Sequence, residues 1–249
     1  MKENFGRSII LIFVKATKMS YPEHPDTILI QNEFYQNGLK EIDIWNYYQK
    51  NKASLVKRMI GRNIIIFFAT GINKMVVIRR MADESVIRFN MRNFDHIISG
   101  RTLSLHSTMK KTEDFGIIDL DVDNFNTAKS AAINVFNQML EAPFVDHCLI
   151  KFTGKSSFHI LVYFKRTMYI DGIREMLHSY ISETYLIKKY TMEYKRKPGI
   201  VNLDISSNKF NGGFITEGSL STIGLKSMLV DINKIQVFKK ENAIIKIST

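Results

Sequence analysis

Apolar and polar positions in the second half of the chain follow the periodicities of strands and helices in turn. Two segments, 127–140 and one beginning at Asp171, carry apolar residues at helical spacing, and aspartate commonly caps a helix N-terminus. The other apolar runs are short and bounded by turn residues, as strands are. They are FGIIDLDV (115–122), CLIKF (148–152), FHILVYF (158–164) and GIVNLDI (199–205). The predicted order is βαββαβ, the ferredoxin-like arrangement.

The first part of the chain has a mixed pattern. Residues 38–59 place apolar side chains at roughly helical spacing, and the apolar runs at 63–69 and 74–80 are typical of strands. No internal repeat and no Pro/Gly/Ser-rich linker marks a domain boundary. We therefore predict an α+β protein with a single domain over 1–249. An N-terminal α/β accessory region (1–110) precedes a ferredoxin-like (RRM-like) core (111–249).

Composition narrows the class of partner and the compartment. The net charge of +11 favours a polyanion, with nucleic acid ahead of an acidic membrane surface. A single cysteine, Cys148, excludes a disulfide framework and a multi-cysteine zinc site, and fits a reducing cytoplasm. The apolar run at 9–14 is too short for a signal sequence or a membrane span. We expect a cytoplasmic, intracellular protein with no membrane partner.

Aspartates in the first predicted strand of the core indicate a site. Side chains in a strand alternate between faces, so Asp119 and Asp121 share one face while the apolar residues between them share the other. In a ferredoxin-like sheet both helices cover one face, and the first strand lies between the third and the fourth. The same parity then brings His159 and Asp204 to the open face beside the two aspartates.

Three clustered carboxylates repel one another unless a cation lies between them, and their hard oxygens suit Mg²⁺ or Mn²⁺ in a two-metal site. The adjoining loop TGKSS (153–157) offers hydroxyls, a lysine and backbone N–H groups for phosphate. Each feature alone has a structural explanation. The D-x-D aspartates would make turn hydrogen bonds, Asp123 would be a turn or cap residue, His159 would be a satisfied structural histidine, and TGKSS would be an ordinary polar loop. Their shared sheet face favours a nucleotide site. The basic run at 188–197 fits a solvated helix end or a nucleic-acid groove equally well.

The motifs IIDLDVD, FTGKSSFHI and VNLDISSN followed by EGSLSTIGL, as a set, resemble the archaeo-eukaryotic primase superfamily. In particular they look like the polymerase domain of bacterial ligase D and its stand-alone archaeal relatives in end joining. The basic run KRKPGIVNLD before the third aspartate, and GLKEIDIWNYY followed by GRN near the N-terminus, are similar too. The resemblance covers most of the chain.

The resemblance implies roles for individual residues. Asp119, Asp121 and Asp204 would be catalytic and bind the metal ions, and Lys40 would contact the 5′-phosphate of a broken DNA end. Thr153 stands where the family usually has serine. The implied nucleotide-binding residues are Thr153, Gly154, Lys155, Ser156, Ser157, His159, Asn208 and Ser219, and the implied DNA-binding residues are Lys40, Lys195, Arg196 and Lys197.

The chain also departs from the family pattern. Ser207 stands where the family typically has arginine or glutamine, and Ser221 stands where it has arginine. The absence of that second arginine removes a bidentate phosphate clamp. Lys209 or Lys226 would compensate as point charges only. The aromatic pair that the family stacks against the template is absent from KMVVIRR.

These observations predict a metal-dependent nucleotidyltransferase that extends a DNA or RNA primer from nucleoside triphosphates. Lys40 favours gap or end filling in DNA repair, with a separate ligase or other replication or repair protein as partner. The alternatives are a primer-synthesising primase small subunit, a catalytically impaired nucleic-acid-binding module on the same fold, and a metal-dependent nuclease. RNA-binding modules of this fold stack bases on sheet-face aromatics, whereas this face carries aspartates, which disfavours the binding module. A nuclease would not need the triphosphate loop, so nucleotide binding separates it from the polymerase.

Overall fold

The computed structural model describes residues 38–71, 74–192 and 199–245. The chain divides into two compact units. The first contains the described residues up to Ser107, the segment Ile215–Lys226 and the end of the described chain from Ile244. The second contains Thr108–Phe214 and Ser227–Ala243.

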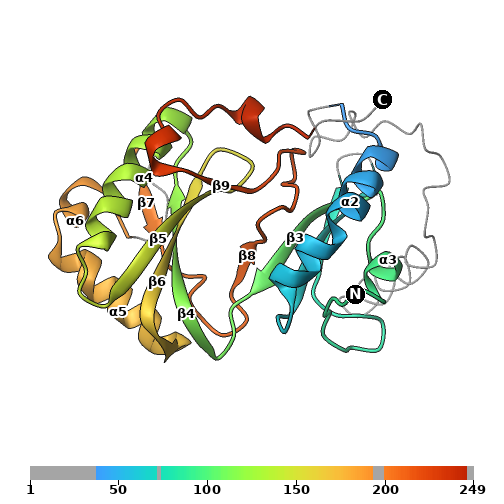
Figure 1. Ribbon diagram of the computed structural model, residues 1–249, viewed down its shortest axis with the longest axis horizontal. Coiled ribbons are helices and arrows are strands. Elements are labelled where there is room, and N and C mark those ends of the chain that lie inside the picture. The colour runs from blue at the N-terminus through green and yellow to red at the C-terminus, as the bar shows by residue number, and fades with distance from the viewer. Residues whose placement is uncertain (1–37, 72–73, 193–198, 246–249) are drawn as a thin grey trace, which may run out of the picture. The chain divides into compact units, whose positions relative to one another are not determined.

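The first unit combines a long helix with an antiparallel sheet (Figure 1). Helix α2 (Glu41–Met59) and strands β1 (Ile64–Gly71) and β2 (Lys74–Ile78) occur where the hydrophobic pattern predicts them. The sheet order is β2-β1-β3-β8, with β3 at Thr102–Thr108 and β8 at Gly213–Ile215. A short helix, α3, spans Phe94–Ile97. The core of this unit is aliphatic and aromatic, and includes Ile44, Tyr48, Met59, Ile64, Ile66, Phe94 and Leu105.

Strand β3 was not predicted, and its composition explains why. Its sequence TLSLHST contains small polar residues at positions that are buried, among them Thr102, Ser104 and Ser107. A hydroxyl can be buried where it finds a hydrogen-bond partner, and Ser107 Oγ lies 2.8 Å from Thr216 Oγ1. The buried hydroxyl of Ser107 is thus satisfied by a residue far along the chain, and a polar residue at a buried position interrupts the hydrophobic pattern.

The second unit is the predicted ferredoxin-like core. Its elements are β4 (Thr112–Asp121), α4 (Phe125–Leu140), β5 (Val145–Phe152), β6 (Phe158–Tyr169), α5 (Ile170–Glu183) and β7 (Asn202–Asp204). The sheet order is β7-β4-β6-β5-β9, and all pairs are antiparallel. The first strand of the motif, β4, therefore lies between the third, β6, and the fourth, β7, as expected. Strand β9 (Met228–Val230) adds an edge that the sequence did not indicate.

Both helices cover one face of this sheet (Figure 1). Glycine at 116 allows this close packing, because a Cβ there would lie 2.8 Å from Leu177 Cδ1 and 3.0 Å from Ile173 Cγ2, both on α5. Ile118 and Leu120 follow on the same face of β4 and are buried completely. The helix-facing side of the sheet is thus a closely packed apolar layer.

Three details of the predicted elements need correction. Asn124, not Asp123, caps α4: its side chain accepts a hydrogen bond from Thr127 N at 2.9 Å. Asp171 lies in the first turn of α5 rather than at its cap, which is Tyr169, because the long strand β6 runs directly into the helix. A short helix, α6 (Leu186–Lys189), follows α5, and 3₁₀ turns occur at Ile232–Lys234 and Lys240–Ala243.

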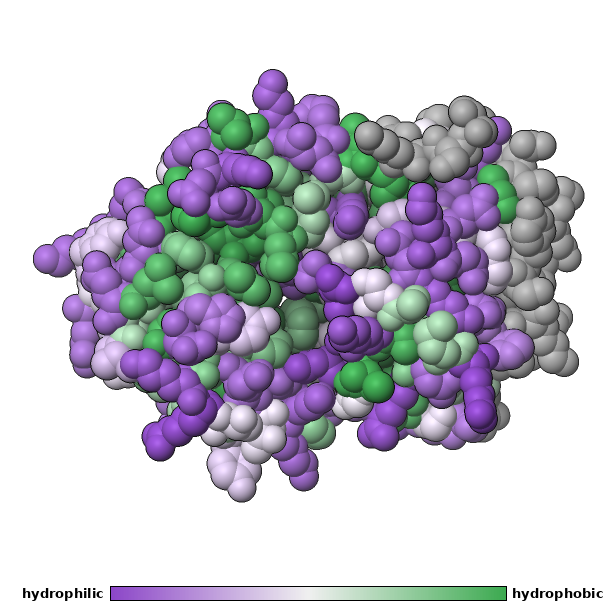
Figure 2. Space-filling model, in the orientation of Figure 1, coloured by the Kyte–Doolittle hydropathy of each residue, from purple (hydrophilic) through white to green (hydrophobic). Residues whose placement is uncertain are grey.

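The surface of the second unit mixes polar and apolar side chains in the view of Figure 2. Leu140, Tyr169 and Val237 are exposed apolar residues of this unit, while Cys148 is buried. Among the described residues, no helix combines the length and the apolar character needed to cross a lipid bilayer.

Candidate functional site

Four polar side chains form one row across the central strands of the second unit. Asp119 on β4 lies opposite His159 on β6 and opposite Asp204 on β7. Lys151 on β5 lies opposite His159. Directly opposed residues in an antiparallel pair point to the same face, with Cβ atoms about 4.5–5.5 Å apart. The register therefore makes neighbours of Asp119 and Asp204, which are 85 positions apart in the sequence.

This row lies on the face that the helices leave uncovered, because Ile118 and Leu120, which alternate with Asp119, pack toward the helices. The Asp119 side chain is 28% exposed, and the His159 side chain is 8% exposed. Asp121 and Asp204 are half-buried. The expected convergence of the three aspartates and the histidine on one open face is what the register produces.

His159 holds an unusual position beside Asp119. Its Nε2 lies 3.5 Å from Asp119 Oδ2, and its Nδ1 is buried without a hydrogen-bond partner. A buried polar atom without a partner costs about 1–3 kcal/mol. Such a cost is typical of a site where a ligand group supplies the missing bond.

The loop 153–157 joins β5 to β6 next to this row. Thr153 closes it: its N and Oγ1 both donate to the Ser157 carbonyl oxygen, at 3.1 and 3.0 Å. Gly154 has a φ of +89°, a left-handed conformation that favours glycine. Ser157 Oγ lies 3.5 Å from Asp119 Oδ1, and Lys155 is exposed. The loop therefore places hydroxyls and the exposed Lys155 side chain at the edge of the row.

Asp121 and Asp204 are the other two carboxylates on this face. Asp121 lies opposite Asn202, and Asp204 accepts hydrogen bonds from Ser206 N at 2.7 Å and Ser206 Oγ at 3.1 Å. With the side chains in these positions, no three His, Cys, Asp or Glu residues of the described chain are gathered into a metal centre. The donor set itself, carboxylate and amide oxygens on one sheet face, matches the ligand preference of Mg²⁺ or Mn²⁺.

Lys151 is a site residue that the sequence analysis missed. It is 1% exposed although it is charged, and its Nζ lies 5.1 Å from the centre of the Phe214 ring. Buried lysines need compensation from aromatic faces or opposite charges. The signal was present in the sequence: Lys151 is the one charged residue in the apolar run CLIKF, and its parity places it opposite His159.

Asn208 is tied into the sheet. Its Oδ1 accepts from Ile117 N at 2.8 Å, and its Nδ2 donates to the carbonyl oxygens of Ile117 at 2.6 Å and Ile205 at 2.9 Å. Strand β7 ends at Asp204, so the amide takes the place of a further strand residue beside β4. Asn208 is fully buried.

The remaining predicted residues are distributed over the chain. Lys40 and Ser219 belong to the first unit. Lys40 caps α2 and its N donates to Asp43 Oδ2 at 2.8 Å. Ser219 is fully buried, and its Oγ accepts from Leu105 N at 2.7 Å. The predicted DNA-binding residues Lys195, Arg196 and Lys197 lie outside the described residues.

Ser207 and Ser221, the two departures from the family pattern that the sequence resembles, both make local hydrogen bonds. Ser207 Oγ donates to the Gly213 carbonyl oxygen at 3.2 Å, and Ser221 Oγ accepts from Ile223 N at 3.3 Å. Lys209 is exposed and Lys226 is half-buried.

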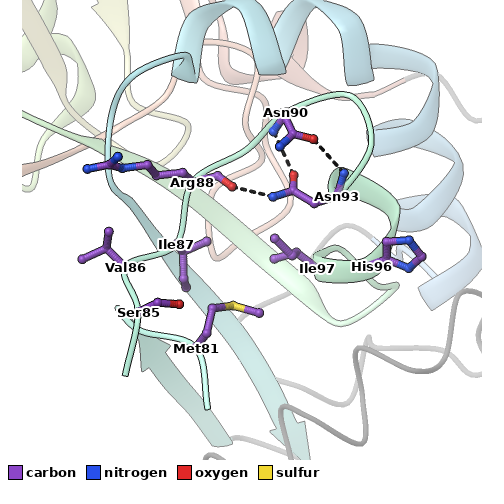
Figure 3. A pocket seen from close by; sticks show the side chains of 9 residues that line it. All are labelled: Met81, Ser85, Val86, Ile87, Arg88, Asn90, Asn93, His96 and Ile97. Atoms are coloured by element: carbon purple, nitrogen blue, oxygen red, sulfur yellow. Dashed lines mark hydrogen bonds between the residues drawn. The ribbon is translucent and has the colours of Figure 1, made fainter. Parts of the chain in front are cut away.

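A pocket of about 400 Å³ lies in the first unit (Figure 3). Polar groups that line the pocket form hydrogen bonds with one another. Asn93 Nδ2 donates to the Arg88 carbonyl oxygen, and Asn90 N donates to Asn93 Oδ1, both at 2.8 Å. None of the residues singled out from the sequence lines this pocket. We therefore place the candidate site at the row of Asp119, His159, Asp204 and Lys151 on the second unit.

Comparison with known proteins identifies the fold. No family model and no curated protein matches the sequence. Among solved structures, the chain is similar to the polymerase domain of ligase D from Mycobacterium tuberculosis, which was determined in complex with DNA. The TM-score is 0.68 at 12% sequence identity, over 86% of this chain and 87% of that chain. The resemblance expected from the motifs is thus confirmed for the fold, and this chain has the α+β fold of that polymerase domain.

Proposed function

We propose that the chain is a metal-dependent nucleotidyltransferase that adds nucleotides to a DNA or RNA primer end, with gap or end filling in DNA repair as its role. The row formed by Asp119, Asp204 and His159 beside the loop 153–157 carries the proposal. Support also comes from the fold, since the similar ligase D domain is named as a polymerase and was solved with DNA.

In this proposal each group of the site has a task. Asp119, Asp121 and Asp204 would hold Mg²⁺ or Mn²⁺, and the bound ions would supply activation of a 3′-hydroxyl and charge stabilisation for pyrophosphate. His159 Nδ1 and the hydroxyl of Ser157 bind phosphate oxygens of the incoming nucleotide. The unpartnered state of Nδ1 supports this task, because a phosphate oxygen would satisfy it.

The charges of the site also favour a triphosphate. Bound cations must offset the carboxylates before a polyanion can approach. Lys155 is exposed at the loop and can follow the phosphates, whereas Lys151 is buried below His159 and remains in place. A buried charge is screened less by salt than an exposed one. In this proposal Lys151 supports His159 from the neighbouring strand, while Lys155 contacts the phosphates.

The experiment is extension of a labelled primer across a gap with a 5′-phosphate, with Mn²⁺ or Mg²⁺ and each ribo- and deoxynucleotide tested separately. Wild type is compared with Asp119→Asn and with Asp146→Asn, a surface carboxylate on the same sheet that is 61% exposed. Wild type and Asp146→Asn should add nucleotides only with metal, and Asp119→Asn should not.

The same assay separates the alternatives. Synthesis without a primer would indicate a primase, and metal-dependent shortening of the primer would indicate a nuclease. Tight DNA binding without any addition by wild type would contradict the proposed activity. In that case Ser207 and Ser221 would mark a disabled catalytic site, and the chain would be a nucleic-acid-binding module.

A further inference from the structure

Asn202 is the second buried residue of the open face with an unpartnered polar atom. It is 5% exposed, and its Oδ1 has no hydrogen-bond partner. It lies on β7 directly opposite Asp121 and two residues before Asp204, so all three side chains share one face. The site therefore extends beyond the three aspartates and the histidine.

The chemistry around Asn202 Oδ1 determines which partner it lacks. An amide oxygen is an acceptor, and its neighbours Asp121 and Asp204 carry carboxylates, which when ionised are acceptors only. Acceptors gathered on one face are stabilised together by a cation. Neutral amide oxygens are regular ligands of hard divalent cations beside carboxylates.

We propose that Asn202 supplies an oxygen ligand to the divalent cation held by Asp121. The inference rests on the proposed function because it concerns the same metal site. Asn202 would allow one ion to be shared between β4 and β7 without adding a further negative charge. An amide in place of a fourth carboxylate leaves the site less repulsive toward the triphosphate.

The structural alternative is that Asn202 donates a hydrogen bond to Asp121 through Nδ2 and needs no metal. Two substitutions separate the alternatives. Asn202→Asp keeps an oxygen ligand but removes the donor, so it should retain or tighten Mn²⁺ binding if Asn202 is a ligand. Asn202→Leu has similar volume and removes both functions.

The experiment is calorimetric titration of the full chain with Mn²⁺, together with thermal melting without metal. We expect Asn202→Leu to weaken Mn²⁺ binding by about tenfold or more, and Asn202→Asp to bind at least as tightly as wild type. Without metal, Asn202→Leu should melt at a higher temperature than wild type, because a buried unpartnered oxygen is replaced by an apolar group. The matched control is Asn208→Leu, which should melt lower because its amide is fully bonded.

The outcomes keep this inference apart from the proposed function. If Asp121→Asn abolishes Mn²⁺ binding while Asn202→Leu binds like wild type, only the role of Asn202 is overturned. Loss of both stability and binding in Asn202→Asp would also overturn it, in favour of the donor role. If wild type does not bind Mn²⁺, or Asp121→Asn binds it unchanged, the metal site itself is wrong and both proposals fail.

Discussion

Replacement of Asn208 by alanine tests whether this residue holds the catalytic strand in place. The side chain makes three hydrogen bonds of 2.8, 2.6 and 2.9 Å, two of them to the peptide groups of Ile117 on β4. Ile117 is fully buried, so water does not replace these bonds easily. Ile117 lies two residues before Asp119 on the same strand.

The magnitude follows from the bond count. Each bond contributes about 1 kcal/mol net, so three contribute about 3 kcal/mol. The buried N–H and C=O of Ile117 lose their partners in Asn208→Ala, which raises the expected loss to about 3–5 kcal/mol. A loss of about 3 kcal/mol lowers the folding equilibrium constant roughly a hundredfold. This is a large part of the stability of a typical domain, about 5–15 kcal/mol.

Urea unfolding of the full chain measures the effect as a lower midpoint at an unchanged slope. The control is Asn137→Ala on the exposed side of α4, which should change stability by less than about 0.5 kcal/mol. A loss below about 1 kcal/mol in Asn208→Ala would refute the bridging role. If the same variant also raised the KM for nucleotide, the family-implied role of Asn208 in nucleotide binding would hold instead.

Three further predictions concern packing. Gly116→Ala should lower stability by about 1–3 kcal/mol, because its Cβ would lie 2.8 Å from Leu177 Cδ1; an unchanged melting temperature would contradict the packing of α5 on β4. Gly172→Ala in α5 meets no atom within 4 Å and should stabilise by about 1 kcal/mol, so its melting temperature should rise. Burial raises the pKa of the Cys148 thiol to about 12, so a disulfide reagent at mildly alkaline pH should modify it only as the protein unfolds. Modification of native protein as fast as free cysteine would show that β5 is exposed there.

The hydrophobic pattern was sufficient for the elements of the second unit because its strands and helices have strong periodicity. Strands β4, β5 and β6 and helix α4 occur where the pattern placed them, and the parity of Asp119 follows from Ile118 and Leu120 alone. The pattern failed at β3 and β9. Buried hydroxyls conceal β3, and β9 is three residues long, too short for a periodic signal.

The alternation within each strand can be read directly from the amino-acid order, since covalent geometry sets which neighbours share a face. From that alternation and the βαββαβ order, the row of Asp119, His159 and Asp204 could be predicted. The environment of each polar group, in contrast, depends on the tertiary packing. Pairing of β7 with β4 places Asn202 opposite Asp121, and the surrounding side chains bury Lys151. Register and burial depend on contacts between distant segments, and no local pattern encodes those contacts.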